Sequence, residues 1–354
     1  MATATLVDEY NVLSTNGQGK LDRISKPLKS SKSPLPEVAE LDSSSATADD
    51  VVKCLKVAGG VIVRNLLGSD EINRILEDVI PYLDEDQPWD GEFFPPETRR
   101  AFGLMGKSRT FATSIVGNPL WIGVADALLT SHSKYNWVRY ISFSTICEYT
   151  LLIEAVQVGD KNEESISVPQ VHNTIAFRIG PGASAQPLHR DDGPHHPDHR
   201  AIAEHVLGRD SGVGLFVAGT KATKANGATR FIPGSHLWDY REGPPKEEQT
   251  FQAELNPGEA FMMLSGCFHG GSANTTEDED RILLSTFSTR GWLRQEENQY
   301  LANSIESIKD LPPALQERMG YGLSRPFMGW VELKSPMLLL HPQSIKDLKD
   351  LWGS

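Results

Sequence analysis

The sequence predicts a mainly β fold with flanking helices, built as one domain. Apolar residues recur at helical spacing before about residue 130, and strand-forming character dominates from about Thr145 onward. A chain of 354 residues with 39% hydrophobic content can bury one large core. Because β-rich folds of this size commonly remain a single domain, we expect residues 46–335 to fold as one unit.

The two ends of the chain are expected to lie outside this domain. Residues 1–45 contain Ser, Lys and Pro with little periodicity, which indicates a flexible N-terminal arm or a strap over the surface. Order is expected to begin near Asp49. At the other end, residues 336–354 are predicted to form a C-terminal tail.

Helical support is predicted for about residues 50–130. A short helix starting near Val51 precedes a strand at residues 59–64, and Ser69 is the expected cap of the next helix. That helix carries apolar residues at helical spacing, namely Ile72, Ile75, Leu76 and Val79. Residues 84–119 are rich in Pro, Gly and aromatic residues and predict a long loop on the active-site side. A further helix is expected at residues 121–129.

The β core is predicted over about residues 145–290. Residues 171–179 alternate as a strand, with Asn173 and Phe177 on one face. The turn Gly180-Pro181-Gly182 then leads into a His-Arg-Asp motif. The face that carries Phe177 can line a pocket or can belong to the core, and the pattern alone fits both.

Three side chains form a candidate metal site. In an extended segment His189 and Asp191 project to the same side, so both can contact one cation, while Arg190 points away. His269 follows an apolar, strand-like run and supplies a second imidazole. Two imidazoles and one carboxylate are the ligands of the facial triad that binds non-heme Fe(II) and leaves coordination positions open.

Other histidines compete for this role, since an H-x-D pair often occurs by chance. Gly193, Pro194 and Pro197 interrupt regular structure after the motif, which argues against a rigid metal site there. We therefore interpret the histidines of this stretch as side chains near the mouth of a pocket: His195, His196, His199 and His205. His172 has no supporting context.

Arg281 lies twelve residues after His269 and opens a run rich in strand formers. A guanidinium near a metal can bind a dicarboxylate through two parallel hydrogen bonds. Arg281 also follows the acidic residues 277–280, so a solvated residue at the end of a loop is the alternative interpretation. The upstream His269 favours the functional role.

Four motifs together resemble the phytanoyl-CoA dioxygenase-like family of Fe(II)/2-oxoglutarate oxygenases, particularly the fungal enzymes that tailor secondary metabolites. The resemblance covers about residues 50–335. The motifs are AQPLHRD at residues 185–191, NGATRFIPGSH at 226–236, PGEA at 257–260, and His269 with Asn274 and Arg281. One departure is Gly271, which stands where many members have a serine, and this puts any role of the following Ser272 in doubt.

The resemblance implies a double-stranded β-helix, which is a jelly roll of two antiparallel sheets. It implies that His189, Asp191 and His269 bind iron and that Arg281 pairs with the distal carboxylate of 2-oxoglutarate. It further assigns Gln186 and Thr229 to the cosubstrate, with Ser285 as an additional hydroxyl, and Asn173 and Phe177 to the substrate pocket. No catalytic residue is expected beyond the metal ligands.

The implied reaction uses Fe(II), 2-oxoglutarate and O2 to oxidise a C–H bond of a small hydrophobic metabolite in natural-product biosynthesis. Hydroxylation, desaturation and related rearrangements all remain open. One alternative is a jelly-roll metal-binding protein without turnover, and another is an acyl hydroxylase of the phytanoyl-CoA type. No basic cluster suited to the phosphates of coenzyme A lies near the motifs, which disfavours the acyl hydroxylase. A Zn(II) hydrolase could use the same ligand types but would not need Arg281 or Gln186.

Charge and cysteine content restrict the partners and the compartment. The net charge of −13 disfavours binding to nucleic acid or to an anionic membrane. The three cysteines, Cys54, Cys147 and Cys267, form no metal-type spacing and fit a reducing compartment, so cytoplasmic localisation is expected. Aromatic residues between Gly291 and Trp330 suggest a homodimer, although internal packing would explain them equally well.

Overall fold

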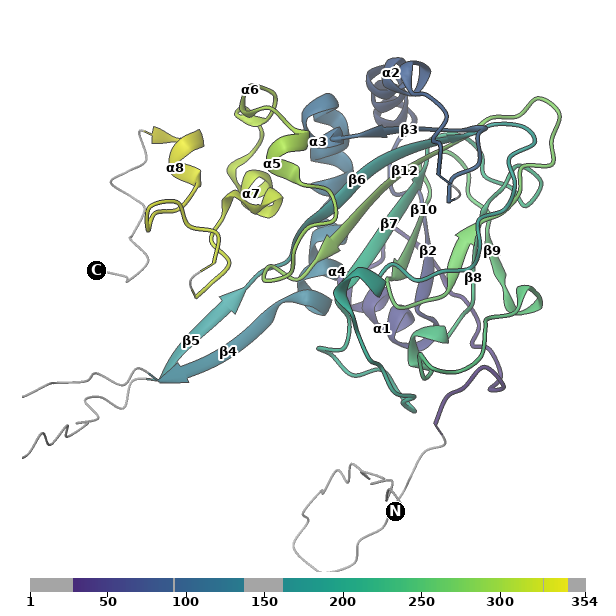
Figure 1. The fold of residues 1–354 in the computed structure, drawn as a ribbon, viewed down its shortest axis with the longest axis horizontal. Coiled ribbons are helices and arrows are strands. Elements are labelled where there is room, and N and C mark those ends of the chain that lie inside the picture. Colours follow the sequence, from purple (N-terminus) through teal and green to yellow (C-terminus); the bar gives the residue numbers. More distant parts are fainter. Residues whose placement is uncertain (1–27, 92, 137–161, 327, 343–354) are drawn as a thin grey trace, which may run out of the picture.

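The computed structural model describes residues 28–91, 93–136, 162–326 and 328–342. A large twisted sheet forms the centre of the molecule, with helices on its outer side and a smaller sheet across from it (Figure 1). The large sheet has the strand order β1-β2-β10-β7-β12-β6-β3. Its strands are β1 (Glu40–Asp42), β2 (Gly60–Arg64), β3 (Thr98–Phe102), β6 (Gln170–Ile179), β7 (Gly212–Ala218), β10 (Ala260–Leu264) and β12 (Arg281–Thr289).

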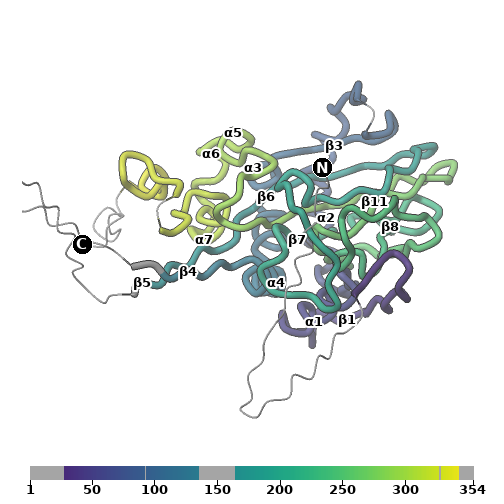
Figure 2. The backbone as a smooth tube through the Cα atoms, turned by 60° about the horizontal axis from the view of Figure 1, so that its bottom comes forward, coloured from purple at the N-terminus to yellow at the C-terminus, as the bar shows by residue number. Residues whose placement is uncertain are grey.

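The smaller sheet has the order β11-β8-β9. Its strands are β8 (Thr229–Phe231), β9 (Phe251–Ala253) and β11 (His269–Gly271), and β8 lies beside β11 (Figure 2). The segment at His189 adds to this sheet through a bridge to His269. From β6 onward the chain passes back and forth between the two sheets, with β8 and β9 following each other in the smaller one, as in a double-stranded β-helix. The predicted jelly roll with flanking helices is confirmed.

Three longer helices cover the outer face of the large sheet. They are α1 (Ala48–Ala58), α2 (Ser69–Glu85) and α4 (Pro119–Leu129). The apolar stripes predicted from sequence are the buried ones, as for Val51 and Leu55 of α1 and for Ile72 and Ile75 of α2. The side chain of Thr47 caps α1, whereas α2 begins one residue earlier than predicted, with Gly68 at the N-cap position.

The stretch at residues 84–119 differs from the predicted continuous loop. From Thr98 onward it contains strand β3, helix α3 (Leu104–Lys107) and a π-helical turn at Phe111–Val116. Strand β3 forms because it pairs along β6, with Arg100 opposite Phe177, and it becomes the edge strand of the large sheet. The sequence pattern did not predict this strand because it contains charged residues. In the fold, the charge of the buried Arg100 side chain is compensated by a 3.1 Å ion pair with Asp86.

The N-terminal boundary also differs from the prediction. Strand β1 pairs in parallel with β2, so the ordered sheet begins before residue 45 and before Asp49. Upstream of β1, the backbone N–H of Ser31 donates to the Glu242 carboxylate, and the backbone carbonyl of Ser31 accepts from the Gln249 side chain. The described residues of the expected arm therefore lie against the body as a strap, and residues 1–27 lie outside the described residues.

Beyond β12 the chain forms short helices beside one end of the large sheet: α5 (Gln299–Ala302), α6 (Ile305–Ile308), α7 (Pro313–Gln316) and α8 (Met337–Leu340) (Figure 1). The expected tail at residues 336–354 includes α8, whose Met337 and Leu340 belong to the core. A hairpin of β4 (Ser131–Asn136) and β5 (Asn162–Ser167) projects from the body. Within the described residues, no helix combines the length and the apolar character needed to cross a membrane.

Candidate metal centre

The structure brings the three predicted metal ligands together. His189 and His269 face each other across two backbone hydrogen bonds, of 2.9 Å from His189 N to His269 O and 2.8 Å in the reverse direction. The Asp191 backbone N–H donates to Ser265 O at 3.0 Å, which fixes the carboxylate beside the histidines. One ligand atom of each side chain lies within 4.8 Å of the other two. Among the described residues, this is the one such group of three His, Cys, Asp or Glu side chains.

Hydrogen bonds prepare both imidazoles for a metal. The Nδ1 atom of His189 lies 2.8 Å from Pro187 O, and that of His269 lies 3.2 Å from Cys267 O. Because a carbonyl oxygen can only accept, each Nδ1 carries a proton, and each Nε2 is left to face the Asp191 carboxylate. The Nε2 atoms lie 3.6 Å and 3.2 Å from the Asp191 oxygens for His189 and His269 respectively. The donor set therefore fits one divalent cation.

Burial and mutual charge set the protonation of this group. Burial, together with His269, lowers the pKa of His189. Burial also disfavours a charged His269, but the Asp191 carboxylate outweighs it and raises the pKa of His269. Burial raises the pKa of Asp191, but the two histidines outweigh that effect and lower its pKa overall. Asp191 is thus held as the carboxylate that a metal requires.

Arg281 begins β12 and is 2% exposed. Its Nε and Nη1 atoms are buried without a hydrogen-bond partner. Burial lowers the pKa of Arg281 to about 10. An unpaired buried guanidinium costs free energy, so this arrangement fits an anion that binds in the pocket.

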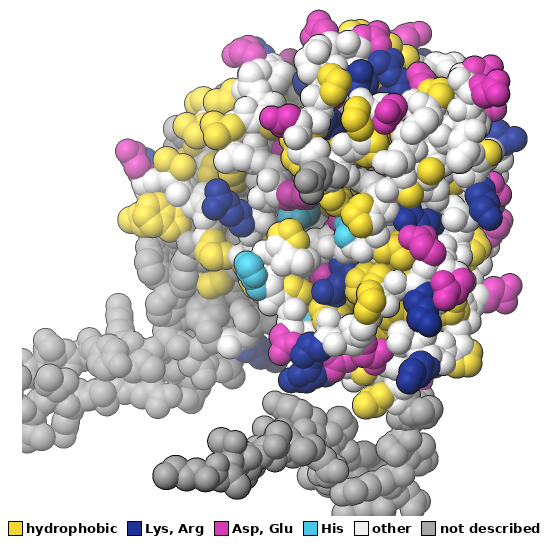
Figure 3. Space-filling view, turned by 45° about the vertical axis from the view of Figure 1, so that its right-hand side comes forward, with side chains coloured by type: hydrophobic (Ala, Val, Ile, Leu, Met, Phe, Trp, Pro, Cys, Tyr) yellow, Lys and Arg dark blue, Asp and Glu magenta, His cyan; other side chains and the backbone are white. Residues whose placement is uncertain are grey.

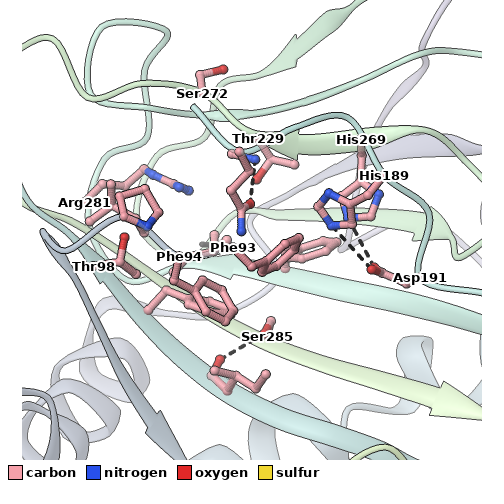
Figure 4. Close-up of a pocket in the computed structure, with 18 of the residues that line it drawn as sticks. Phe93, Phe94, Thr98, His189, Asp191, Thr229, His269, Ser272, Arg281 and Ser285 are labelled. Carbon is pink, nitrogen blue, oxygen red and sulfur yellow. Dashed lines mark hydrogen bonds and ion pairs between the residues drawn. The ribbon is translucent and has the colours of Figure 1, made fainter. Parts of the chain in front are cut away.

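All nine residues predicted for the site line one pocket, which has a cavity volume of about 180 Å³. They are His189, Asp191, His269, Arg281, Gln186, Thr229, Ser285, Asn173 and Phe177. Figure 4 shows Arg281 and the triad at separate positions around the pocket, with aromatic rings between them. The space-filling view shows histidine side chains in a hollow of one face of the molecule (Figure 3).

Two of the predicted polar residues are already partly engaged. The Gln186 side-chain oxygen accepts the Gly271 N–H at 2.9 Å, which leaves its amide N–H groups available to a ligand. The Ser285 hydroxyl donates to Ile175 O at 2.9 Å, so only its lone pairs remain for the pocket. Thr229 starts β8 directly opposite Gly271.

Sequence reasoning missed several pocket residues. Phe93 packs edge-on against His189, with ring centroids 5.0 Å apart. The ring centroids of Phe94 and Phe177 are 5.8 Å apart. The aromatic content of residues 84–119 was the available signal, and the prediction that this stretch lies on the active-site side agrees with these contacts. Ser272 also lines the pocket, as does Glu296, for which no motif gave a signal.

The four competing histidines lie apart from the triad. His205 Nε2 contacts Asp210 at 2.6 Å, and His199 stacks on Tyr240 with ring centroids 4.9 Å apart. His195 lies beside His172, with ring centroids 5.1 Å apart, and His196 is exposed. As predicted, none of the four belongs to the group of metal ligands. None of them lines the pocket, so their predicted place near its mouth stays a prediction.

Comparison with known proteins places the chain in a family. Residues 55–282 match the family "Phytanoyl-CoA dioxygenase (PhyH)". The chain is 38% identical over 316 residues to the dioxygenase cnsJ of Penicillium expansum, with 88% of each chain covered. It is 37% identical to the dioxygenase peniF of Penicillium patulum (85% of this chain, 91% of the relative) and 36% identical to the dioxygenase himG of Aspergillus japonicus (84% and 88%). This chain therefore belongs to the phytanoyl-CoA dioxygenase family.

Proposed function

We propose that this Fe(II)/2-oxoglutarate dioxygenase oxidises a C–H bond of a small hydrophobic metabolite in natural-product biosynthesis. The observation that carries the proposal is the buried Arg281 guanidinium, which has unpaired N–H groups in the same pocket as the triad. A metal site alone needs no such cation. A dicarboxylate cosubstrate that reaches both the metal and Arg281 accounts for both features.

In this proposal His189, Asp191 and His269 hold Fe(II), and Arg281 pairs with the distal carboxylate of 2-oxoglutarate. Gln186 and Thr229 contact the cosubstrate from the side, and Ser285 offers its lone pairs. When bound, Fe(II) and 2-oxoglutarate supply O2 activation, coupled to decarboxylation of the keto acid to succinate and CO2. The chain positions the reactants and excludes water with its apolar walls.

The pocket walls support a hydrophobic substrate. Phe93, Phe94 and Phe177 contribute aromatic surface, and Phe216 and Phe287 also line the cavity. Asn173 and Phe177 are the substrate-pocket residues of the proposal. Fungal dioxygenase relatives support a role in natural-product biosynthesis. Hydroxylation, desaturation and rearrangement remain possible outcomes, because they depend on fine placement of the substrate.

Two alternatives are less well supported. A metal-binding protein without turnover would have no use for the unpaired Arg281. A coenzyme A ester would need cations for its phosphates, and among the described residues that line the pocket, Arg281 is the one Lys or Arg side chain. We therefore favour a small metabolite over an acyl-CoA.

We also propose a homodimer in the cytoplasm. Three aromatic side chains of the C-terminal segment, Trp292, Tyr300 and Trp330, are 44–49% exposed, which supports an interface. Cys54 and Cys267 are free thiols, which supports a reducing compartment, whereas Cys147 lies outside the described residues. Light scattering after size-exclusion chromatography tests the dimer, and a monomeric mass would contradict it.

A binding experiment tests the function directly. Calorimetric titration of 2-oxoglutarate into the protein, with Zn(II) in place of Fe(II), should show binding that requires the metal. A second assay with Fe(II), O2 and 2-oxoglutarate should release succinate. Absence of keto-acid binding by the metal-loaded protein would overturn the proposal, and a hydrolase would show a rate that is indifferent to 2-oxoglutarate.

A further inference from the structure

Glu296 stands at the junction of two cavities. It lines the pocket of the metal centre and also an open outer groove of about 900 Å³, whose lining includes Trp292, Tyr300 and Met328. Its side chain is 53% exposed, whereas the neighbouring His172 and Asn173 are buried. Glu296 is therefore placed to contact a ligand in the metal pocket and is also accessible from the outer groove.

One carboxylate oxygen of Glu296 accepts a hydrogen bond from Asn173 and lies near His172. The His172 Nδ1 atom accepts the backbone N–H of Glu296 at 3.1 Å, so the His172 proton lies on Nε2. That Nε2 lies 3.6 Å from Glu296 Oε2, and the Asn173 Nδ2 group donates to the same oxygen at 2.5 Å. Among the described residues, no group donates a hydrogen bond to Oε1. The Oδ1 atom of Asn173, the residue that donates to Oε2, is buried and also has no partner.

The charges around the pocket leave Glu296 without compensation. In the proposed complex, the positive charges of Fe(II) and Arg281 match the negative charges of Asp191 and 2-oxoglutarate. Burial lowers the pKa of His172 to about 4, so this neighbour is neutral at physiological pH. No Lys or Arg in the described part of the chain forms an ion pair with Glu296. Burial raises the pKa of Glu296 above its ordinary value, and a bound cation would offset that effect. The ionised Glu296 gives the pocket one excess negative charge, on a residue that also lines the outer groove.

We infer that Glu296 is a specificity-determining residue that binds a protonated amine of the substrate through its free carboxylate oxygen. The unpartnered Oδ1 of Asn173, which lines the same pocket, is a second acceptor. Because aromatic and aliphatic side chains such as Phe177, Phe216 and Leu283 line the same pocket, the substrate class is a hydrophobic amine with its reacting carbon on the apolar part. This inference rests on the proposed function and adds the charge of the substrate to it.

A purely structural role is the competing explanation. Glu296 links the segment after β12 to strand β6 through His172 and Asn173. Glu296→Gln separates the two explanations, because an amide keeps the size and one acceptor oxygen but removes the charge. A structural role predicts lower thermal stability with no change in ligand preference. A recognition role predicts a lost preference for cations in a protein that remains folded.

The probes are phenethylamine and 2-phenylethanol, which share an aromatic ring and differ in a protonated amine against a hydroxyl. Saturation-transfer NMR titrations would be performed on the protein loaded with Zn(II) and 2-oxoglutarate, which cannot turn over. The wild-type protein should bind the amine about ten-fold or more tightly than the alcohol, as expected for a charge-assisted hydrogen bond. Glu296→Gln should reduce this ratio to within about two-fold.

The matched control is Glu306→Gln, which removes an exposed carboxylate of the same C-terminal segment and should keep the wild-type ratio. Binding of 2-oxoglutarate is measured first for every protein. A protein that fails to bind 2-oxoglutarate would contradict the proposed function. Normal 2-oxoglutarate binding without a preference for the amine, including no binding of either probe, would overturn the role of Glu296 alone. An unchanged preference in Glu296→Gln would overturn it as well.

Discussion

His189 and His269 are eighty residues apart in sequence, yet they exchange both backbone hydrogen bonds as one isolated antiparallel pair. Opposed residues of such a pair hold their side chains at a fixed separation, and the imidazole centroids lie 4.5 Å apart. The backbone thus sets the spacing of the two nitrogen ligands before any metal binds. The carboxylate of Asp191 completes the group from the same segment as His189.

Replacing Asp191 with alanine should abolish turnover. The change removes the one negatively charged member of the triad, and succinate release should fall by at least about a hundred-fold. Asp198→Ala is the control, since Asp198 is exposed on the loop that follows. Succinate release by Asp191→Ala at the wild-type rate, measured with Fe(II) and 2-oxoglutarate, would refute the metal assignment.

Replacing Arg281 with alanine should mainly weaken cosubstrate binding. Loss of a bidentate pair with a carboxylate costs roughly 2 to 4 kcal/mol, so the apparent KM for 2-oxoglutarate should rise by about 30- to 1,000-fold. The control is Arg178→Ala on the neighbouring strand, where the side chain pairs with Asp84 at 2.6 Å. An unchanged KM in Arg281→Ala would exclude the proposed role.

Gly59→Ala should destabilise the fold more than Gly182→Ala. Both glycines have positive φ angles, of +76° and +83°, which L side chains rarely adopt. A Cβ atom at Gly59 would overlap Cys267 Sγ, whereas nothing lies within 4 Å of one at Gly182. We expect the free energy of unfolding to decrease by about 2 to 5 kcal/mol for Gly59→Ala and by about 1 kcal/mol for Gly182→Ala. Urea unfolding measures both, and equal losses would contradict the steric explanation.

Because of His236, the free energy of unfolding should decrease as the pH is lowered. This residue is 1% exposed, and burial lowers its pKa from 6.5 to about 4. Between these pH values the unfolded chain binds a proton that the folded protein does not. The contribution of His236 to stability is therefore fully present above pH 6.5 and is lost as the pH falls toward 4.

The effect of His236 can be measured as a slope. One proton corresponds to at most about 1.4 kcal/mol per pH unit. His236→Gln should reduce the dependence of the unfolding free energy on pH by up to that amount, whatever its effect on stability at neutral pH. Urea unfolding at several pH values between 4 and 7 gives both slopes. Identical slopes for the two proteins would show that His236 does not titrate in this range.

Several parts of the protein followed from local sequence. The apolar spacing of Ile72 and Ile75 predicted the buried face of α2, because a helix repeats every 3.6 residues. The alternation around Asn173 and Phe177 likewise predicted strand β6, but it left open whether their shared face lines a pocket or belongs to the core; in the structure both residues line the pocket. The motif residues His189, Asp191, His269 and Arg281 were assigned to one site, and the structure brings them to one pocket.

Other features depended on partners that are distant in sequence. Strand β3 exists through its pairing with β6, and the charged Arg100 hid it from pattern analysis because Asp86 compensates that charge. Strand β1 was also missed, because it is three residues long and depends on its pairing with β2. Short strands carry too few residues to show a period, so their formation depends on the neighbouring strand.

The sequence by itself determined which chemical groups this protein has for its reaction: two imidazoles, a carboxylate and a guanidinium, at spacings that a jelly roll brings together. Only the tertiary structure decided what surrounds them. Phe93, Phe94 and Glu296 reach the pocket from a loop and from a C-terminal segment that no motif marks. The physical reason is that ligand identity is a property of single residues, whereas the shape and charge of a cavity arise from long-range packing.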